Sequence, residues 1–215
     1  QKVNEAWHPI FQKKPHNSKW EDIKKEYKDV VDALSLPQFQ VKPPTAAEMK
    51  ARAKKNGQSA PGSDGITFKE LAALPEWLWK YAEELFSAIQ DKQDFQWPDE
   101  MLDALTILIP KEDSPCSDPA AQRPLTLLSA MYRTWAGVWQ SKLQPWFHQW
   151  ADEGLKGGRK NSEALEISYE VTAMLELKKL MLGNGKGAVI LSFDFAIFFD
   201  SIAWEPLFEL MKVLG

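Results

Sequence analysis

The sequence predicts a mostly helical α+β protein. Two observations predict the helices: apolar residues recur at helical spacing through most of the 215 residues, and two segments open with a Ser or Thr followed three residues later by Glu. Three short apolar runs, near residues 106, 123 and 188, predict a minority of strands. The hydrophobic fraction of 44% excludes a disordered chain. No apolar run approaches the roughly 18 residues that a membrane helix needs.

Charge and composition narrow the classes of protein further. The net charge of −4 argues by itself against a nucleic-acid binder, but residues 1–60 carry 12 basic and 7 acidic side chains. A basic N-terminal third could therefore follow a phosphate backbone. The ten tryptophans are best explained by core packing. The single cysteine, Cys116, cannot form a disulfide within the chain, which favours a reducing compartment.

The first 58 residues predict three helices. An apolar face from Val3 to Phe11 ends at Pro15, and a capping box at Ser18–Glu21 opens a second helix that continues to Leu34. Residues 37–44, bounded by prolines, predict an extended linker. A second capping box, Thr45–Glu48, begins a basic helix, which Asn56 and Gly57 end.

The stretch from Ser59 to Ile66 contains so much Pro and Gly that it must be a shaped turn. Its backbone amides could approach a phosphate, with Lys54 and Lys55 just upstream, although most such turns are ordinary loops. Helices are expected near residues 68–74 and 76–91. The inward face of the second helix is predicted to consist of Leu78, Ala82, Leu85 and Ile89.

Residues 106–111 and 123–128 predict two strands joined by a polar loop. Lys111 leaves the first strand and Arg123 enters the second, so both cations would lie at one end of a hairpin. Lys is a point charge and Arg a bidentate fork, which together suit a triphosphate. Two solvated surface charges are the simpler alternative.

A helix capped by Ser129 is expected to end near Pro145, and a glycine-rich segment with Lys156, Gly158 and Arg159 follows. Backbone donors and cations ahead of a helix predict an anion site, with a flexible loop as the alternative. The next helix is expected to end in the glycine turn at 183–187. Its buried side chains are predicted to be Ala164, Ile167, Val171, Met174 and Leu175.

Residues 188–191 predict a buried strand that delivers Asp194 into a packed interior. A carboxylate at the end of a core strand needs a cation, and a divalent metal carrying a phosphate is the candidate. Asp200 precedes a helix that contains Pro206 in its first turn, and is best explained as a helix-start residue rather than a ligand.

These segments in combination resemble the reverse transcriptases of LINE-type (non-LTR) retrotransposons. The matching segments occur in that family's motif order and approximate spacing between about residues 45 and 215. They are Ala60–Thr67, Ile107–Lys111, Arg123–Leu128, Glu153–Arg159 and Leu191–Ile202.

The resemblance implies part of a right-hand polymerase. Residues 1–44 would be an N-terminal extension, 45–185 the fingers with helical insertions, and 186–215 the start of the palm. The activity implied is RNA-directed DNA synthesis, in which a dNTP is added to a primer 3′-hydroxyl on an RNA template with two Mg²⁺ ions. The family is intracellular, and the nucleus is compatible with it; the oligomeric state stays open.

The resemblance also implies roles for individual residues. Asp194 and the backbone carbonyl of Phe195 would bind the Mg²⁺ ions. Lys111, Arg123 and Phe199 would bind the incoming dNTP, with Phe199 packing under its sugar. The residues matching template contacts are Pro61, Gly62, Asp64, Gly65, Gly158 and Arg159.

The chain also departs from the family pattern. Ile197 and Phe198 stand where a lysine and an alanine are common, and Leu155 replaces a phenylalanine. The family's paired aspartates do not occur before Gly215, so these 215 residues alone are expected to be inactive, because one carboxylate cannot hold two metals. Two alternatives remain open: a degenerate relic that at most binds RNA or a protein, and a fragment of a group II intron-like maturase.

Overall fold

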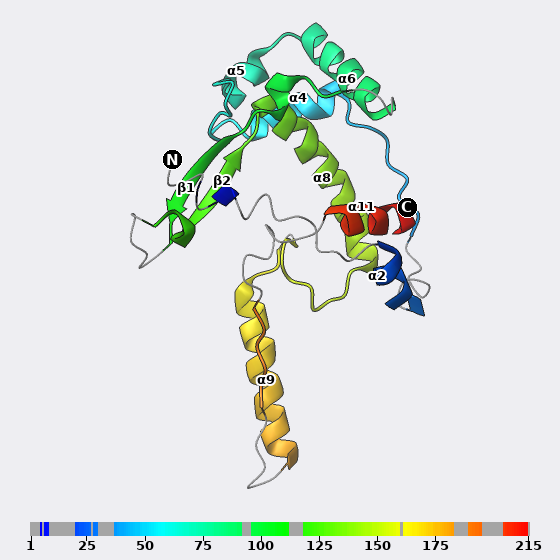
Figure 1. The fold of residues 1–215 in the computed structure, drawn as a ribbon, viewed down its shortest axis with the longest axis vertical. Helices are drawn as coiled ribbons and strands as arrows, with labels where there is room; N and C mark the ends of the chain where they lie inside the picture. Colours follow the sequence, from blue (N-terminus) through cyan, green and yellow to red (C-terminus); the bar gives the residue numbers. More distant parts are fainter. Residues whose placement is uncertain are drawn as a thin grey trace. The chain divides into compact units, whose positions relative to one another are not determined.

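A computed structural model gives the fold of the protein. It describes residues 5, 7–8, 20–26, 28–29, 37–91, 96–111, 118–159, 161–182, 189–194 and 204–214. Within those residues no helix is both long enough and apolar enough to cross a membrane. Helices dominate, and a single pair of antiparallel strands accompanies them in the described part of the chain, as expected for a mostly helical α+β protein (Figure 1).

The chain divides into two compact units. The first unit contains residues 1–16 and 38–145, and the second contains 17–37 and 146–214. The division therefore falls within a helix, at Pro145.

In the first unit, residues 38–45 have no helix or strand, in agreement with the extended linker predicted for residues 37–44, and a group of helices follows. Helix α4 spans Ala46–Lys55, α5 Phe68–Ala73, α6 Glu76–Asp91 and α7 Asp99–Leu102. The predicted capping box at Thr45 is confirmed, and Asn56 caps the other end of α4. A second capping box, which the sequence analysis did not identify, joins Thr67 to Glu70 at the start of α5. Both boxes satisfy backbone N–H groups that a helix start leaves unpaired.

The core of the first unit lies between these helices and the first half of the long helix α8. Met49, Phe68, Trp79 and Phe86 are fully buried in it. The rings of Phe86 and Trp135 stack with centroids 5.0 Å apart. The predicted inward face of α6 was partly wrong: Trp79, Ala82, Phe86 and Ile89 are buried, whereas Leu78 and Leu85 are half-buried. Because the larger aromatic rings fill the core, the buried face of α6 is shifted by about one residue from the predicted face.

The sheet of the first unit is a hairpin of β1, Leu105–Pro110, and β2, Gln122–Leu127. The strands are antiparallel, and the register pairs Leu105 with Leu127 and Ile109 with Arg123. A short 3₁₀ turn, Pro119–Ala121, leads into β2. The two strands predicted from the sequence are therefore confirmed, as is their order.

Helix α8 spans Ala130–Trp150, and the Ser129 hydroxyl accepts a bond from the Tyr132 N–H as predicted. The expectation that Pro145 would interrupt the helix was wrong. Proline removes one backbone hydrogen bond, yet the helix continues for five residues. Edge-to-face packing among the aromatic rings after Pro145 supports this last turn: Trp146, Phe147 and Trp150.

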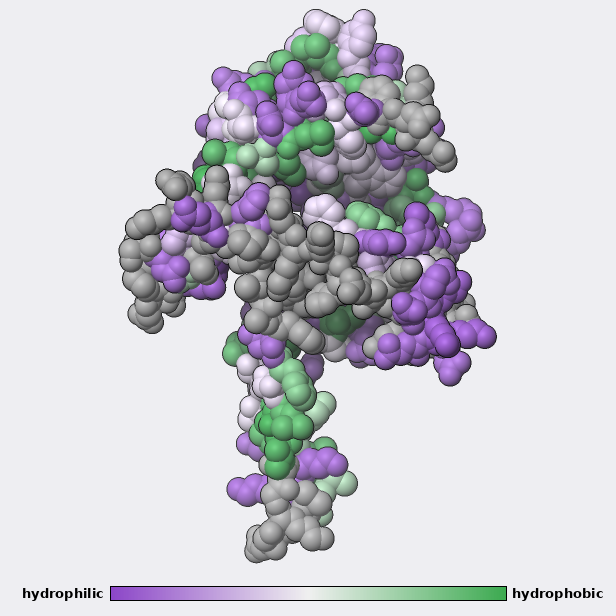
Figure 2. All heavy atoms as spheres, viewed as in Figure 1, coloured by the Kyte–Doolittle hydropathy of each residue, from purple (hydrophilic) through white to green (hydrophobic). Residues whose placement is uncertain are grey.

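The second unit contains three described helices: α2, Trp20–Glu26; α9, Ala164–Leu182; and α11, Trp204–Leu214. Helices α2 and α11 pack together. The predicted burial along α9 was largely wrong, because Ala164, Ile167 and Met174 are exposed and Val171 and Leu175 only half-buried. Apolar side chains are spread around α9 rather than gathered in one stripe, so a single neighbour could not cover them. Apolar side chains are visible on the face of α9 that Figure 2 shows.

The predicted buried strand before Asp194 is also absent from the described residues 189–194, which have no regular secondary structure. Val189 is 85% exposed, and Leu191 and Phe193 are exposed as well. A strand exists only when another strand pairs with it. In the described part of the chain, β1 and β2 pair with each other alone.

Candidate functional site

The hairpin brings the two cations predicted to bind a triphosphate to the same end. Arg123 is the second residue of β2 and lies opposite Ile109, while Lys111 directly follows the last residue of β1. Residues two apart on a strand point to the same face. Lys111, two residues after Ile109, therefore follows on the Arg123 side of the ribbon.

Both cations are exposed. No hydrogen bond or ion pair involving either is found among the described residues, so their charges are available to an anion. Arg123 presents five N–H donors in a fixed fork, and Lys111 adds a compact charge at the end of β1. This arrangement suits the phosphates of a nucleotide better than a single point charge would.

The face of the hairpin that carries Arg123 is otherwise apolar. Leu105, Ile107 and Ile109 alternate along β1 on this face, and Leu125 lies opposite Ile107. All four are exposed. The opposite face contains the Thr106 and Thr126 hydroxyls, 3.4 Å apart. An apolar ribbon that ends in two cations can accept a ligand with a flat apolar body and an anionic end.

The Pro61–Gly65 turn docks against the other end of the hairpin. A Cβ atom on Gly62 would lie 2.4 Å from the Leu128 carbonyl oxygen, so only glycine allows this contact. The Gly65 N–H donates to the Gly62 carbonyl at 3.1 Å, and Gly65 has a φ of +69°. The predicted shaped turn is therefore present. Its geometry requires glycine at position 62 for the close contact and favours glycine at position 65 for the positive φ.

Two side chains hold this turn in place. The Arg133 guanidinium donates to the Ala60 carbonyl and lies 4.8 Å from the centroid of the Phe68 ring. Burial lowers the pKa of Arg133, and the nearby Asp64 carboxylate opposes that shift. The Ser63 hydroxyl donates to the Asp103 carbonyl at 3.1 Å, just before β1. The turn is thus fixed to both strands of the hairpin.

Arg133 was missed by the sequence analysis. It lies four residues after the cap Ser129, on the helix that leaves β2. The sequence gives one indication of its direction, because helical spacing places Arg133 on the same face as Ser129 and Gly137. No local motif indicates that it contacts Ala60, which lies 73 positions earlier.

The turn and the cations lie at opposite ends of the hairpin. Leu128, which contacts Gly62, follows the end of β2, whereas Arg123 is near its start. The five residue steps from Arg123 to Leu128, at about 3.3 Å each, separate the two ends by about 17 Å.

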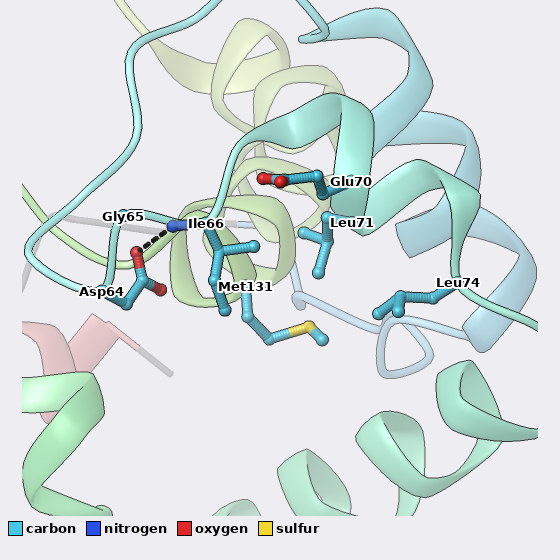
Figure 3. A pocket seen from close by; sticks show the side chains of 7 residues that line it. All are labelled: Asp64, Gly65, Ile66, Glu70, Leu71, Leu74 and Met131. Carbon is cyan, nitrogen blue, oxygen red and sulfur yellow. Dashed lines mark hydrogen bonds between the residues drawn. The ribbon is translucent and has the colours of Figure 1, made fainter.

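A pocket of about 440 Å³ opens beside the turn (Figure 3). Its lining is mostly apolar, and Asp64 and Glu70 add two carboxylates to it. Asp64 accepts a bond from the Ile66 N–H at 3.2 Å, and Glu70 is fixed by Thr67, whose N–H lowers the pKa of that carboxyl. Two carboxylates disfavour a phosphate here. The full lining is Asp64, Gly65, Ile66, Glu70, Leu71, Leu74 and Met131.

The cations of the glycine-rich segment, in the second unit, contact protein groups. Lys156 pairs with Glu170 at 3.2 Å and Glu166 at 3.6 Å, and the Glu170 hydrogen bond raises the pKa of Lys156. Arg159 donates to the Ala151 carbonyl at 3.1 Å, while Gly158 has a φ of +72°. The template role of Gly158 and Arg159 remains a prediction.

Asp194 is exposed rather than enclosed in a packed interior, which corrects the expected setting of this carboxylate. Phe195, Phe199 and Asp200 lie outside the described residues. Among the residues that the structure describes, no three His, Cys, Asp or Glu side chains gather as a metal site. One exposed carboxylate does not make a Mg²⁺ site by itself.

Comparisons with known proteins add no assignment to this geometry. No protein-family model matches the chain, and no curated protein matches it.

Proposed function

We propose that this chain forms the fingers and the start of the palm of an RNA-directed DNA polymerase of the LINE type. The reaction would be template-directed addition of a dNTP to a primer 3′-hydroxyl. The observation that carries the proposal is the hairpin, in which Lys111 and Arg123 occur at the same end without a partner among the described residues. These are the two positions that the motif resemblance assigns to the triphosphate.

A second feature supports the same proposal. The Pro61–Gly65 turn, which the resemblance assigns to the template, is fixed to the opposite end of the same hairpin by Gly62 and Ser63. Nucleotide and template would thus be held by one rigid element. Phosphoryl transfer depends mainly on such positioning and on neutralising phosphate charge.

Triphosphate binding tests the proposal on the chain itself. Anisotropy of a fluorescent dATP would be measured with the wild type, Arg123→Gln and Lys111→Gln. Loss of a charge-assisted hydrogen bond costs about 1.5–3 kcal/mol, so Arg123→Gln should weaken binding about 10- to 100-fold. Lys80→Gln, which removes an exposed lysine of α6, is the matched control and should change nothing. Equal binding by all variants would refute the role of the hairpin.

Primer extension on an RNA template is the second arm. It uses a protein that contains this chain together with a paired-aspartate hairpin, before and after Asp194→Asn. The substitution should abolish extension and leave template binding unchanged. Retained extension would contradict the assignment of Asp194, and RNA binding without triphosphate binding would favour the degenerate relic.

A further inference from the structure

Three lysines gather around the turn that follows α4. Lys54 and Lys55 are the last residues of α4, and Lys69 is the second residue of α5. The aliphatic stem of Lys69 lies against this turn, with its Cγ 3.8 Å from the Cβ position of Gly57. The same turn leads directly into Pro61–Gly65. We call Lys54, Lys55 and Lys69 the lysine surface.

The lysine surface is not neutralised by the protein. All three side chains are exposed, and none has an ion pair with a described residue. The other cations of α4 differ, since Lys50 pairs with Glu76 at 3.0 Å and Arg52 donates to Ser141 at 3.3 Å. These three positive charges therefore have no carboxylate partner within the described part of the chain.

Two acids close in sequence to the lysine surface are already engaged. Glu48 pairs with Lys142 at 2.8 Å and belongs to the Thr45 capping box. Glu70, next to Lys69, accepts bonds from the N–H and hydroxyl of Thr67. Neither carboxylate is therefore committed to the lysine surface.

Helix electrostatics explain two of the lysines but not the third. Lys54 and Lys55 occupy the last turn of α4, where a cation interacts favourably with the helix dipole. Lys69 occupies the first turn of α5, where a cation is unfavourable. The charge of Lys69 therefore gains nothing from its own helix and remains available to an anion.

We propose that the lysine surface binds the phosphodiester backbone of single-stranded RNA. The inference rests on the proposed function and deepens it, because it names the surface by which the template is held. Lysines contribute point charges to phosphates and no base specificity. A membrane surface is the competing anionic partner, and the test separates the two.

The salt dependence of RNA binding provides the test. Anisotropy of a labelled 20-nucleotide RNA would be measured between about 50 and 200 mM salt, where each phosphate contact to a single strand contributes about −0.7 to the slope of log K against log salt. The triple variant Lys54→Gln, Lys55→Gln, Lys69→Gln should therefore lose about 2 units of slope. Single-stranded DNA of the same sequence should show the same loss.

The matched control changes the net charge equally at other exposed lysines: Lys80→Gln, Lys178→Gln, Lys179→Gln. It should keep the wild-type slope. The single variant Lys69→Glu should weaken RNA binding further than Lys69→Gln while the circular dichroism spectrum stays unchanged, which excludes unfolding as the cause.

The outcomes separate this inference from the proposed function. Unchanged slope and affinity in the triple variant overturn the inference, and the proposed function stands if Arg123 still governs triphosphate binding. Binding of neither RNA nor triphosphate by the wild type refutes both. A loss confined to phosphatidylserine vesicles, with RNA binding intact, overturns the inference in favour of a membrane.

Discussion

At the scale of single residues, the candidate site depends on side chains that shape backbone rather than on side chains that do chemistry. Gly62 lets the Pro61–Gly65 turn reach the Leu128 carbonyl, and Arg133 fixes the turn through the Ala60 carbonyl. Both contacts join segments far apart in the sequence. The pattern of glycines predicts a turn, but only the fold shows what the turn touches.

Gly62→Ala should destabilise the first unit. The new Cβ would lie 2.4 Å from the Leu128 oxygen and 2.9 Å from the Ser129 Cα, both of them backbone atoms that cannot move away cheaply. Overpacking of this kind costs about 1–3 kcal/mol. Urea denaturation followed by tryptophan fluorescence would measure the loss.

Gly57→Ala is the control for this prediction. Its Cβ would meet the Lys54 oxygen at 3.4 Å and the Lys69 Cγ at 3.8 Å, which are ordinary contact distances. The free energy of unfolding should stay close to that of the wild type. If Gly62→Ala were as stable as Gly57→Ala, the docking of the turn would be incorrect.

At the scale of elements, local signals in the sequence predicted helix and strand positions well. The capping box at Thr45, the bounds of α6 and the two strands of the hairpin all follow from short patterns. The buried face of a helix and the point at which a helix ends were harder to predict. The leucines of α6 suggested one buried face, yet Trp79 and Phe86 bury another, because ring volume in a shared core decides the rotation.

The α5 capping box predicts a pH-dependent contribution to stability. The Thr67 N–H holds the pKa of Glu70 below its ordinary value of 4.5. Because the folded pKa is the lower one, the stabilisation is complete above the unfolded pKa and is lost as the pH falls through the folded pKa. Glu70→Ala should therefore be less stable than the wild type at pH 7.

The difference in unfolding free energy between wild type and Glu70→Ala should shrink as the pH is lowered below about 4.5. Urea denaturation at pH 7, 5 and 3.5 would measure it. Glu84→Ala, which removes an exposed carboxylate of α6, should show no comparable trend. A constant difference for Glu70→Ala across this range would argue against the capping interaction.

At the scale of the whole molecule, a sequence pattern predicts burial reliably only where the covering side chains belong to the same compact unit. Apolar runs at 164–182 and 188–194 were expected to be buried, but burial needs a partner surface, which periodicity cannot supply. The described residues leave both segments exposed. By contrast, Ala82 and Ile89 were correctly predicted to face inward, because the side chains that cover them lie within the same unit.

Trp79→Ala tests the independence of the units. Trp79 is 0% exposed, and its loss should cost about 3–5 kcal/mol, toward the low end because its buried indole N–H has no hydrogen-bond partner among the described residues. Hydrogen exchange should show lost protection within residues 38–145. Amides of 164–182 should be unaffected, since they belong to the other unit.

Trp77→Ala provides the matched comparison, because Trp77 lies on the same helix but is 58% exposed. Its removal disturbs one edge-to-face contact with Tyr81, worth about 1 kcal/mol or less. Equal effects of the two substitutions, or lost protection in both units after Trp79→Ala, would contradict the division of the chain.

The close contact between Gly62 and Leu128 also determines how the hairpin can move. The ladder between β1 and β2 is continuous over six residue pairs, so the hairpin contains no hinge of its own. Any tilt of the end that carries Arg123 must pivot about the end held by Gly62 and Ser63. The hairpin therefore moves as one rigid body that pivots at the turn. A ligand that displaces the Arg123 end would transmit that displacement to the Pro61–Gly65 backbone at the other end.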